Sequence, residues 1–253
     1  RGNRSLTFPD ENRRGRTPHD RRKGAAMREV FHQTLEDVQS RLVEISELVT
    51  IAMEKASTAF EKSDVSLAEE VIEADIIIDE KAVALDELAI EILARQQPVA
   101  RDLRIVVSAL RMSASLERMG DIAEHVAQLV RMRFPERVVP HGLKSTFTKM
   151  GELDVAAART LTDLLRTEDL RLAEQIREID DKIDELHVSV FEKVLSESWD
   201  HEASATVDAT LASRFHERFG DHAVSVAKKV LYLATGDWAS HDQEIDTTIV
   251  TSD

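Results

Sequence analysis

Apolar residues recur every three or four positions along most of the chain, which is the period of an amphipathic α-helix. The pattern is clearest in two stretches, from Leu67 to Ile92 and from Leu172 to Val194. Six helices are predicted in this way, over residues 28–61, 65–95, 99–133, 142–166, 168–197 and 202–235. No comparable stretch alternates with the period of a strand, so the pattern predicts an all-α protein.

Helix-ending residues lie between these stripes. Ser63 and Asp64 interrupt the first stripe, and Asp64 is suited to cap the helix that follows. Pro98 lies in the next connection, and Gly236 follows the last stripe, where a glycine commonly ends a helix. The connections are therefore short, and short connections place consecutive helices antiparallel to one another.

A linker with a proline at each end divides the chain. Pro135 and Pro140 bracket it, and we take it as the boundary between a first domain, residues 27–134, and a second, residues 141–235. Residues 1–26 are basic and lack an apolar period, so we expect a disordered leader. The polar, acidic tail over residues 236–253 is expected to be disordered as well.

The two halves repeat one another. ERMGDIAEHVAQLV, which begins at Glu117, and ERFGDHAVSVAKKV, which begins at Glu217, match at 8 of 14 positions. The 19-residue segments that begin at Lys62 and Thr167 match at 9 positions, at an offset of 105. The chain is therefore a tandem duplication, and two three-helix bundles are the simplest fold that it can form.

Each repeat carries two pairs of acidic residues at i and i+4, so both carboxylates of a pair lie on one face of a helix. In each half, one pair lies about as far before the predicted helix turn as the other lies after it, which brings four carboxylates to one level. The candidate metal ligands are Asp75, Asp79, Glu117, Asp121, Asp180, Asp184, Glu217 and Asp221.

Clustered carboxylates repel one another unless a cation or a proton joins them. Ligation by oxygen alone suits hard cations, so iron in its ferric form, Mn, Mg or Ca is expected, with Zn as a further option and more than one ion per site allowed by the number of ligands. Glu47 and Glu152 lie at a similar level and could each add a ligand, as could His125 and His222. With 48 acidic residues in the chain, solvated helix faces are the alternative interpretation.

One further residue in each repeat points to close packing. Gly120 and Gly220 lie in the middle of predicted helices, where glycine costs about 1 kcal/mol relative to alanine. Because this cost recurs at the same place in both repeats, we expect another part of the protein to approach the backbone closely there.

Charge and composition argue against several classes of partner and of chemistry. The formal net charge is -15, which argues against nucleic acid as a partner and favours metal cations or basic protein surfaces. The chain has no cysteine, so thiolate metal sites and thiol nucleophiles are excluded. It also has no apolar run long enough to span a membrane, and a soluble cytoplasmic protein is expected.

Three strings, QQPVARDLR from Gln96, LERMGDIAEHVA from Leu116 and ERFGDHAVSVAKKV from Glu217, resemble the PhoU family of phosphate-signalling regulators. The resemblance covers residues 27–235 and implies metal clusters held by the eight carboxylates. It also implies a negative regulator of the phosphate-starvation response, linking the ATPase subunit of a phosphate ABC transporter to a membrane sensor histidine kinase. One departure is Ile122, where the family usually has a histidine and where the second repeat keeps His222.

We therefore expect a non-enzymatic regulator that reaches the membrane only through its partners and has room to form a homodimer. Two alternatives remain open at this stage. A carboxylate-bridged di-metal oxidase would need Glu-x-x-His on two helices, and the nearest matches are Glu29-x-x-His32 and Asp184-x-x-His187. A plain helical scaffold with incidental acidic faces is the other.

Overall fold

Six helices form the whole of the secondary structure in the computed structural model, which describes residues 18–140 and 142–236, with side chains from Gln33 onward. The helices are α1 (Pro18–Lys62), α2 (Val65–Gln96), α3 (Arg101–Arg133), α4 (Lys144–Thr167), α5 (Arg171–Val194) and α6 (Ala203–Thr235). The all-α class and the two three-helix units are as predicted, and no strand occurs in the described ranges.

Local sequence signals explain several helix ends. The side chain of Asp64 accepts a hydrogen bond from the backbone N–H of Leu67, 3.1 Å away, and so caps α2. Gly236 ends α6 in the left-handed conformation, with φ of 77°, which glycine adopts without steric cost. Both residues do what the sequence predicts.

The start of α1 corrects one prediction. We expected residues 1–26 to be disordered, but α1 begins at Pro18, so residues 18–26 are helical. Proline suits the first turn of a helix, and the residues after it extend a helix that the bundle already nucleates, so no apolar stripe is needed there. The remainder of the expected leader, residues 1–17, and residues 237–253 of the expected tail lie outside the described residues.

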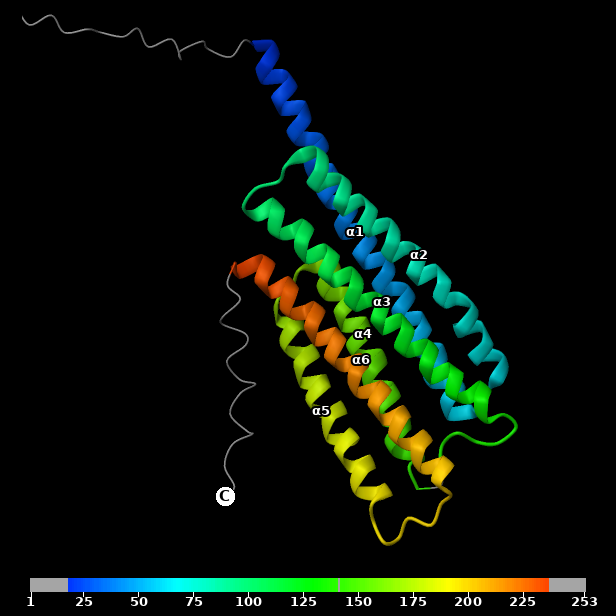
Figure 1. The fold of residues 1–253 in the computed structure, drawn as a ribbon. Coiled ribbons are helices and arrows are strands. Elements are labelled where there is room, and N and C mark those ends of the chain that lie inside the picture. Colours follow the sequence, from blue (N-terminus) through cyan, green and yellow to red (C-terminus); the bar gives the residue numbers. More distant parts are fainter. Residues whose placement is uncertain (1–17, 141, 237–253) are drawn as a thin grey trace, which may run out of the picture.

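The helices form two layers (Figure 1). In the front layer α2, α3, α6 and α5 lie side by side in that order, and α1 and α4 lie behind them. Within each repeat the second and third helices form an antiparallel hairpin, and the first helix covers its back. The front of each hairpin is therefore left open to solvent.

The two repeats meet with their third helices antiparallel. The ring of His125 on α3 stacks on that of Phe215 on α6, with 5.3 Å between the ring centroids. Nearer the end of α3, Arg133 donates to a carboxylate oxygen of Asp208 over 2.9 Å. Residue numbers thus rise along α3 as they fall along α6, and this register brings Gly120 level with Gly220.

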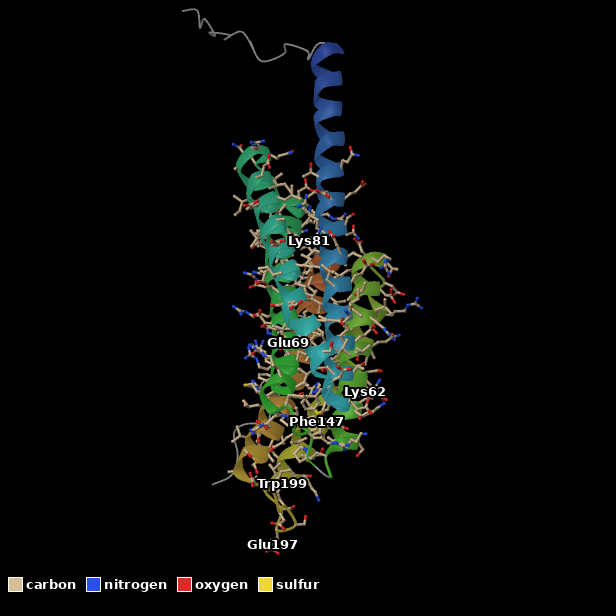
Figure 2. The ribbon with its side chains drawn as sticks, turned by 90° about the vertical axis from the view of Figure 1, so that its right-hand side faces the viewer. Lys62, Glu69, Lys81, Phe147, Glu197 and Trp199 are labelled. Carbon is tan, nitrogen blue, oxygen red and sulfur yellow. The ribbon has the colours of Figure 1, made fainter. Side chains whose placement is uncertain are left out.

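The back layer joins the repeats a second time. Ser46 on α1 and Thr162 on α4 share a buried hydrogen bond of 2.7 Å between their hydroxyl oxygens. Figure 2 shows Lys81 partway along α2, where its Nζ atom pairs with Glu44 of α1 over 2.6 Å. Buried apolar residues from all six helices form one cluster, so the repeats share a single core.

Candidate metal sites

The mid-helix glycines let a carboxylate from the neighbouring helix approach. A Cβ atom on Gly120 would lie 3.2 Å from an oxygen of Asp75 and 3.1 Å from the side chain of Ile78. A Cβ atom on Gly220 would lie only 2.3 Å from an oxygen of Asp180. The close approach expected from the sequence is therefore confirmed, and in both repeats it involves the first aspartate of the acidic set.

The first site lies between α2 and α3. One carboxylate oxygen from each of Asp75, Asp79 and Asp121 lies within 4.8 Å of the others, and all three side chains are partly buried. Glu117 belongs to the same surroundings, because its charge acts on Asp75. The four carboxylates predicted for the first repeat are thus brought together.

Burial and mutual repulsion make two of these carboxylates, Asp75 and Glu117, hard to ionise. Burial, followed by the charges of Asp79 and Glu124, raises the pKa of Asp75 to about 7. Burial also raises the pKa of Glu117, although the neighbouring Arg118 opposes the shift. A cation between these groups would remove the repulsion, whereas without one the cluster holds a proton near neutral pH.

The second site lies between α5 and α6 and is more open. Asp180 and Glu217 are partly buried, while Asp184 and Asp221 are exposed. One oxygen of Asp180 and one of Glu217 are buried without any hydrogen-bond partner among the described residues. Buried polar atoms are usually satisfied, so these two oxygens have coordination capacity that the protein itself does not use.

The electrostatics of the second site parallel those of the first. Burial, followed by the charges of Asp184 and Asp221, raises the pKa of Asp180 to about 7. Burial likewise raises the pKa of Asp184, and burial together with Asp221 raises that of Glu217. The four carboxylates predicted for the second repeat therefore also act on one another.

Three neighbours of the sites are not among the eight predicted ligands. Glu124 acts on Asp75 in the first site, one turn after Asp121. Asp86, two turns after Asp79, acts on Glu117 and has a buried oxygen without a partner among the described residues. His187 lies beside Asp184, and its Nδ1 atom is 2.6 Å from Oγ of Ser213.

Each site is bordered by an arginine. Arg118 pairs with Asp121 over 2.5 Å, and Arg214 pairs with Glu217. Each arginine partly neutralises the rim of its site and leaves Asp75 and Asp180 in the interior without such a partner.

Several residues suggested by the sequence do not join the sites. Glu47 pairs with Arg166 and Glu152 with Lys149, on the helices of the back layer, so the expectation that they are fifth ligands is wrong. His125 is engaged in its stack on Phe215. A similar level along the bundle does not determine which face of the bundle a side chain occupies.

The residues that follow Asp121 and Asp221 differ between the repeats. Ile122 is buried in the core, while His222 is partly buried. Burial lowers the pKa of His222, and Arg218 contributes in the same direction. Of the two Asp/Glu-x-x-His pairs, Asp184 and His187 fall at the second site, and the side chains of the other pair lie outside the described ones.

The donor set decides which metals fit. The first site offers carboxylate oxygens alone, which suit hard cations such as Mn, Mg, Ca or ferric iron. The second site adds an imidazole nearby, which iron and zinc accept more readily than Mg or Ca do. The residues present therefore fit a bound cation, and the half-buried, mutually repelling oxygens would bind it most tightly when deprotonated.

The family model described as "PhoU domain" matches the chain twice, over residues 42–130 and 147–230. The chain belongs to the PhoU family. The matched ranges contain all but the last residues of both hairpins, so each copy of the PhoU domain includes one acidic site. The duplication read from the sequence is the repetition of this family's domain.

Curated relatives share the family over nearly their full lengths. A protein of Mycobacterium leprae named phosphate-specific transport system accessory protein PhoU homolog 1 is 41% identical over 216 residues, which cover 85% of this chain and 97% of that protein. PhoU homolog 2 of Mycobacterium tuberculosis is 41% identical over 210 residues, covering 83% and 99%. Both are similar to this chain across both repeats.

Solved structures share the fold. The crystal structure of PhoU from Pseudomonas aeruginosa is 30% identical in sequence, with a TM-score of 0.75 over 82% of this chain and all of that one. The structure of the phosphate transport system regulatory protein PhoU from Streptococcus pneumoniae, 23% identical, gives a TM-score of 0.74 and supports the fold alone. Across the described part of the chain, no helix is long and apolar enough to cross a membrane.

Proposed function

We propose that this chain is a metal-binding, non-enzymatic regulator of phosphate uptake in the cytoplasm. It acts as a negative regulator of the phosphate-starvation response, between the ATPase subunit of a phosphate ABC transporter and a membrane sensor histidine kinase. Family membership supports the connection to phosphate transport, because the relatives are named as accessory proteins of the phosphate-specific transport system. It reaches the membrane through these partners.

The observation that carries the metal proposal is the duplicated carboxylate cluster. Asp75, Asp79 and Asp121 place three oxygens within 4.8 Å of one another, and Asp180 and Glu217 each keep a buried oxygen unused. A cation, iron or another hard ion, would supply positive charge that the cluster lacks. Its effect would be to hold α2 against α3 and α5 against α6, and so to fix the surface that partners meet.

Elemental analysis tests the metal proposal. The protein is purified, incubated with Mn²⁺ or ferric iron, desalted and analysed by mass spectrometry. We expect Asp79→Asn/Asp121→Asn to remove the metal of the first site and Asp184→Asn/Asp221→Asn that of the second, since each pair loses charged ligands with little change in shape. The matched control is Glu47→Gln/Glu152→Gln, which removes two exposed carboxylates of the back layer and should leave the metal content unchanged.

Metal that resists both site variants, or that is lost equally in the control, would reject the ligand assignment. The regulatory part is tested separately in cells that lack the protein, with a reporter of the phosphate-starvation response. Wild type and the control variant should repress the reporter at high phosphate, and the combined site variant should not. Equal repression by all three would separate metal binding from regulation.

A further inference from the structure

Exposed apolar side chains gather on both hairpins of the front layer, between each acidic site and the turn of its hairpin. The first apolar patch consists of Val83, Ile90 and Val107, which are 58%, 59% and 38% exposed. The second apolar patch consists of Val188, Leu195 and Val207, which are 56%, 81% and 55% exposed. Single exposed apolar residues are common in folded proteins. Only the arrangement of these six residues can therefore indicate a function.

The two patches are equivalent under the duplication. Val83 corresponds to Val188 and Ile90 to Leu195 at the offset of 105, and Val107 corresponds to Val207 at the offset of 100. Three positions are thus both exposed and apolar in each repeat. In the surrounding stretches, residues 81–95 and 186–200, the repeats are identical only at Val83/Val188 and Glu87/Glu192. Burial cannot explain why these solvent-facing positions are apolar in both copies, whereas contact with a partner can.

The hairpin register places the members of each patch together. Ser113 donates from its Oγ to the carbonyl oxygen of Ala82, and the hydroxyl of Ser213 lies 2.6 Å from Nδ1 of His187, the residue that corresponds to Ala82. Ile90 and Leu195 lie eight positions closer to the turn than Ala82 and His187. Val107 and Val207 lie six positions closer to the turn than Ser113 and Ser213. At 1.5 Å per residue, this leaves an offset of about 3 Å along the hairpin in both repeats.

Duplicated glutamates flank the patches. Glu80 and Glu87 lie three and four residues from Val83, and the corresponding Glu185 and Glu192 lie at the same spacing from Val188. All four are exposed, and none of them forms an ion pair with any side chain that the structure describes. On the other side, Asp79 and Asp184 of the metal sites lie one turn away. Carboxylates therefore border each apolar patch along α2 and α5, while on α3 Arg104 and Arg111 lie three and four residues from Val107.

This combination restricts the partner. Anionic membranes and nucleic acids would be repelled by the carboxylates on α2 and α5. The apolar strip beside these carboxylates complements a helix that has lysines or arginines next to an apolar stripe. Val83 and Ile90 are seven residues apart, about 10.5 Å, and this spacing equals that of apolar anchors at i and i+7 on a docked helix.

We propose that each apolar patch, with its flanking glutamates, docks one basic amphipathic helix of a partner protein, so that a single chain binds two such helices. The inference goes beyond the proposed metal binding, because no residue of a patch is a metal ligand. It gives a chemical description to the surface through which a regulator of this kind contacts other proteins.

The probe is a synthetic 18-residue helical peptide with leucines at i, i+4, i+7 and i+11 and lysines on both flanks of the leucine stripe. Binding is measured by isothermal titration calorimetry, once in EDTA and once after loading the protein with Mn²⁺. We expect two peptides to bind per chain. A peptide of the same composition with its leucines dispersed around the helix is the control for charge alone, and a version with glutamate for lysine should not bind.

Substitutions locate the binding surface. Val83→Ser/Ile90→Ser should remove one of the two binding events, Val188→Ser/Leu195→Ser the other, and each should weaken its own site at least tenfold, since two half-exposed apolar side chains lose their contact. The control is Ile51→Ser, on α1, which is 50% exposed and corresponds to Ala156 rather than to an apolar patch residue. All these positions are exposed, so circular dichroism should confirm that each variant folds.

The proposal fails if the dispersed-leucine peptide binds as tightly as the striped one, or if Ile51→Ser weakens binding as much as the patch variants do. It also fails if anionic phosphatidylglycerol vesicles, rather than the peptide, are bound through the patches. Sedimentation that shows a dimer lost on Val83→Ser/Ile90→Ser would assign the surface to a second copy and overturn it. Because peptide binding is measured without metal, its failure would leave the metal proposal intact, and the reverse also holds.

Discussion

At the scale of single residues, the glycines opposite Asp75 and Asp180 link backbone packing to the acidic sites. In each repeat the absence of a side chain on one helix makes room for a carboxylate of the next, and a Cβ atom would intrude more in the second repeat than in the first. A substitution at these glycines should therefore change the position of an aspartate without exposing any of the core.

We predict that Gly220→Ala displaces the carboxylate of Asp180 and lowers Mn²⁺ occupancy of the second site at least severalfold. The stability of the fold should change by no more than about 1 kcal/mol, because alanine favours the helix by about that amount and a short side chain can rotate away. Metal content and urea denaturation measure the two effects.

The control is Gly151→Ala, where a Cβ atom would lie 2.9 Å from Ser57 in the contact between α4 and α1. That variant should lose stability and keep its metal. If Gly220→Ala retains full occupancy of the second site, Asp180 is not a ligand.

A second prediction concerns pH. Because the pKa values of Asp75 and Asp180 are raised to about 7, each site must release a proton when it binds a cation below that pH. Mn²⁺ affinity should therefore rise by up to about tenfold per pH unit and site below pH 7 and level off above it. Calorimetry from pH 5.5 to 8.5 tests this, and a constant affinity across that range would contradict it.

The same pKa values determine whether the metal-free protein gains or loses stability as the pH rises. The folded pKa of about 7 exceeds the ordinary value of 3.8 for an aspartate, so the folded state holds protons that the unfolded chain has already released. These two groups therefore favour folding at low pH and lose that contribution as the pH rises from about 4 to 7. Added metal should reverse the loss above pH 7, as measured by thermal unfolding with and without Mn²⁺.

Residue-level reading of the sequence predicted the eight carboxylates that lie at the two sites, because the duplication marked them and helical spacing paired them. It did not include Glu124 or Asp86 among the ligands, and it named His187 only in the Asp184-x-x-His187 match. These side chains join the sites only through the packing of one helix on another, and none of the three has a counterpart in the other repeat that could mark it.

At the scale of helices, the core of the second repeat contains a polar pair. Asp154 on α4 and His216 on α6 are 0% and 1% exposed, with 2.6 Å between Oδ2 and Nδ1. Burial raises the pKa of Asp154 to about 6, and the histidine opposes the shift. At the corresponding positions the first repeat has Val49 and Leu116, both buried.

Val49 and Leu116 of the first repeat therefore indicate which apolar residues can replace Asp154 and His216 in the second repeat. Asp154→Val should cost about 3 kcal/mol, because it leaves the imidazole of His216 buried without its partner. Asp154→Val/His216→Leu should return to within about 1 kcal/mol of wild type or exceed it, since replacing a buried, hydrogen-bonded polar pair by packed apolar groups is often neutral or stabilising.

Urea denaturation at pH 7 measures both variants, with metal content as the check that the second site survives. If the double variant is no more stable than the single one, the pair has a role in packing that Val49 and Leu116 do not reproduce in this setting. Val49→Ala is a useful reference for the cost of a cavity at the equivalent level of the first repeat.

Helix positions were predicted well where a local signal marks them. Asp64 and Gly236 fix helix ends by their own side-chain and backbone chemistry, which can be recognised from the sequence alone. The start of α1 was misplaced because residues 18–26 carry no apolar stripe. A helix that is extended from an existing bundle needs no such stripe, so periodicity could not reveal it.

At the scale of the whole molecule, the repeats behave as one body in their packing. The buried apolar residues of both repeats form a single core, and α1 packs against α4 while α3 packs against α6. The core is therefore continuous between the two halves. Sequence patterns predicted two bundles but not this union. The residues that join the bundles, such as Ser46 with Thr162 and His125 with Phe215, show no pattern that separates them from other helix positions.

We predict that the two repeats unfold together. Leu85→Ala, at a fully buried position in the first repeat, should cost about 2–5 kcal/mol. Hydrogen exchange followed by mass spectrometry should then show protection lost by similar amounts in α3 and in α6. Loss confined to α1, α2 and α3 would mean that the repeats are independent folding units.

The antiparallel packing of the two repeats, through α1 and α4 as well as through α3 and α6, has a consequence for the origin of the chain. Under the offset of 105, Ser46 corresponds to Gly151 and Ser57 to Thr162, so the contact of Ser46 with Thr162 and that of Gly151 with Ser57 are the same contact seen from opposite repeats. This is the geometry of an isologous interface, in which one surface binds a copy of itself. A single repeat would therefore have paired with its own copy as a symmetric dimer. Joining two copies in one chain kept that interface and released the halves from having to be identical, which is how a buried histidine and aspartate could enter one half alone.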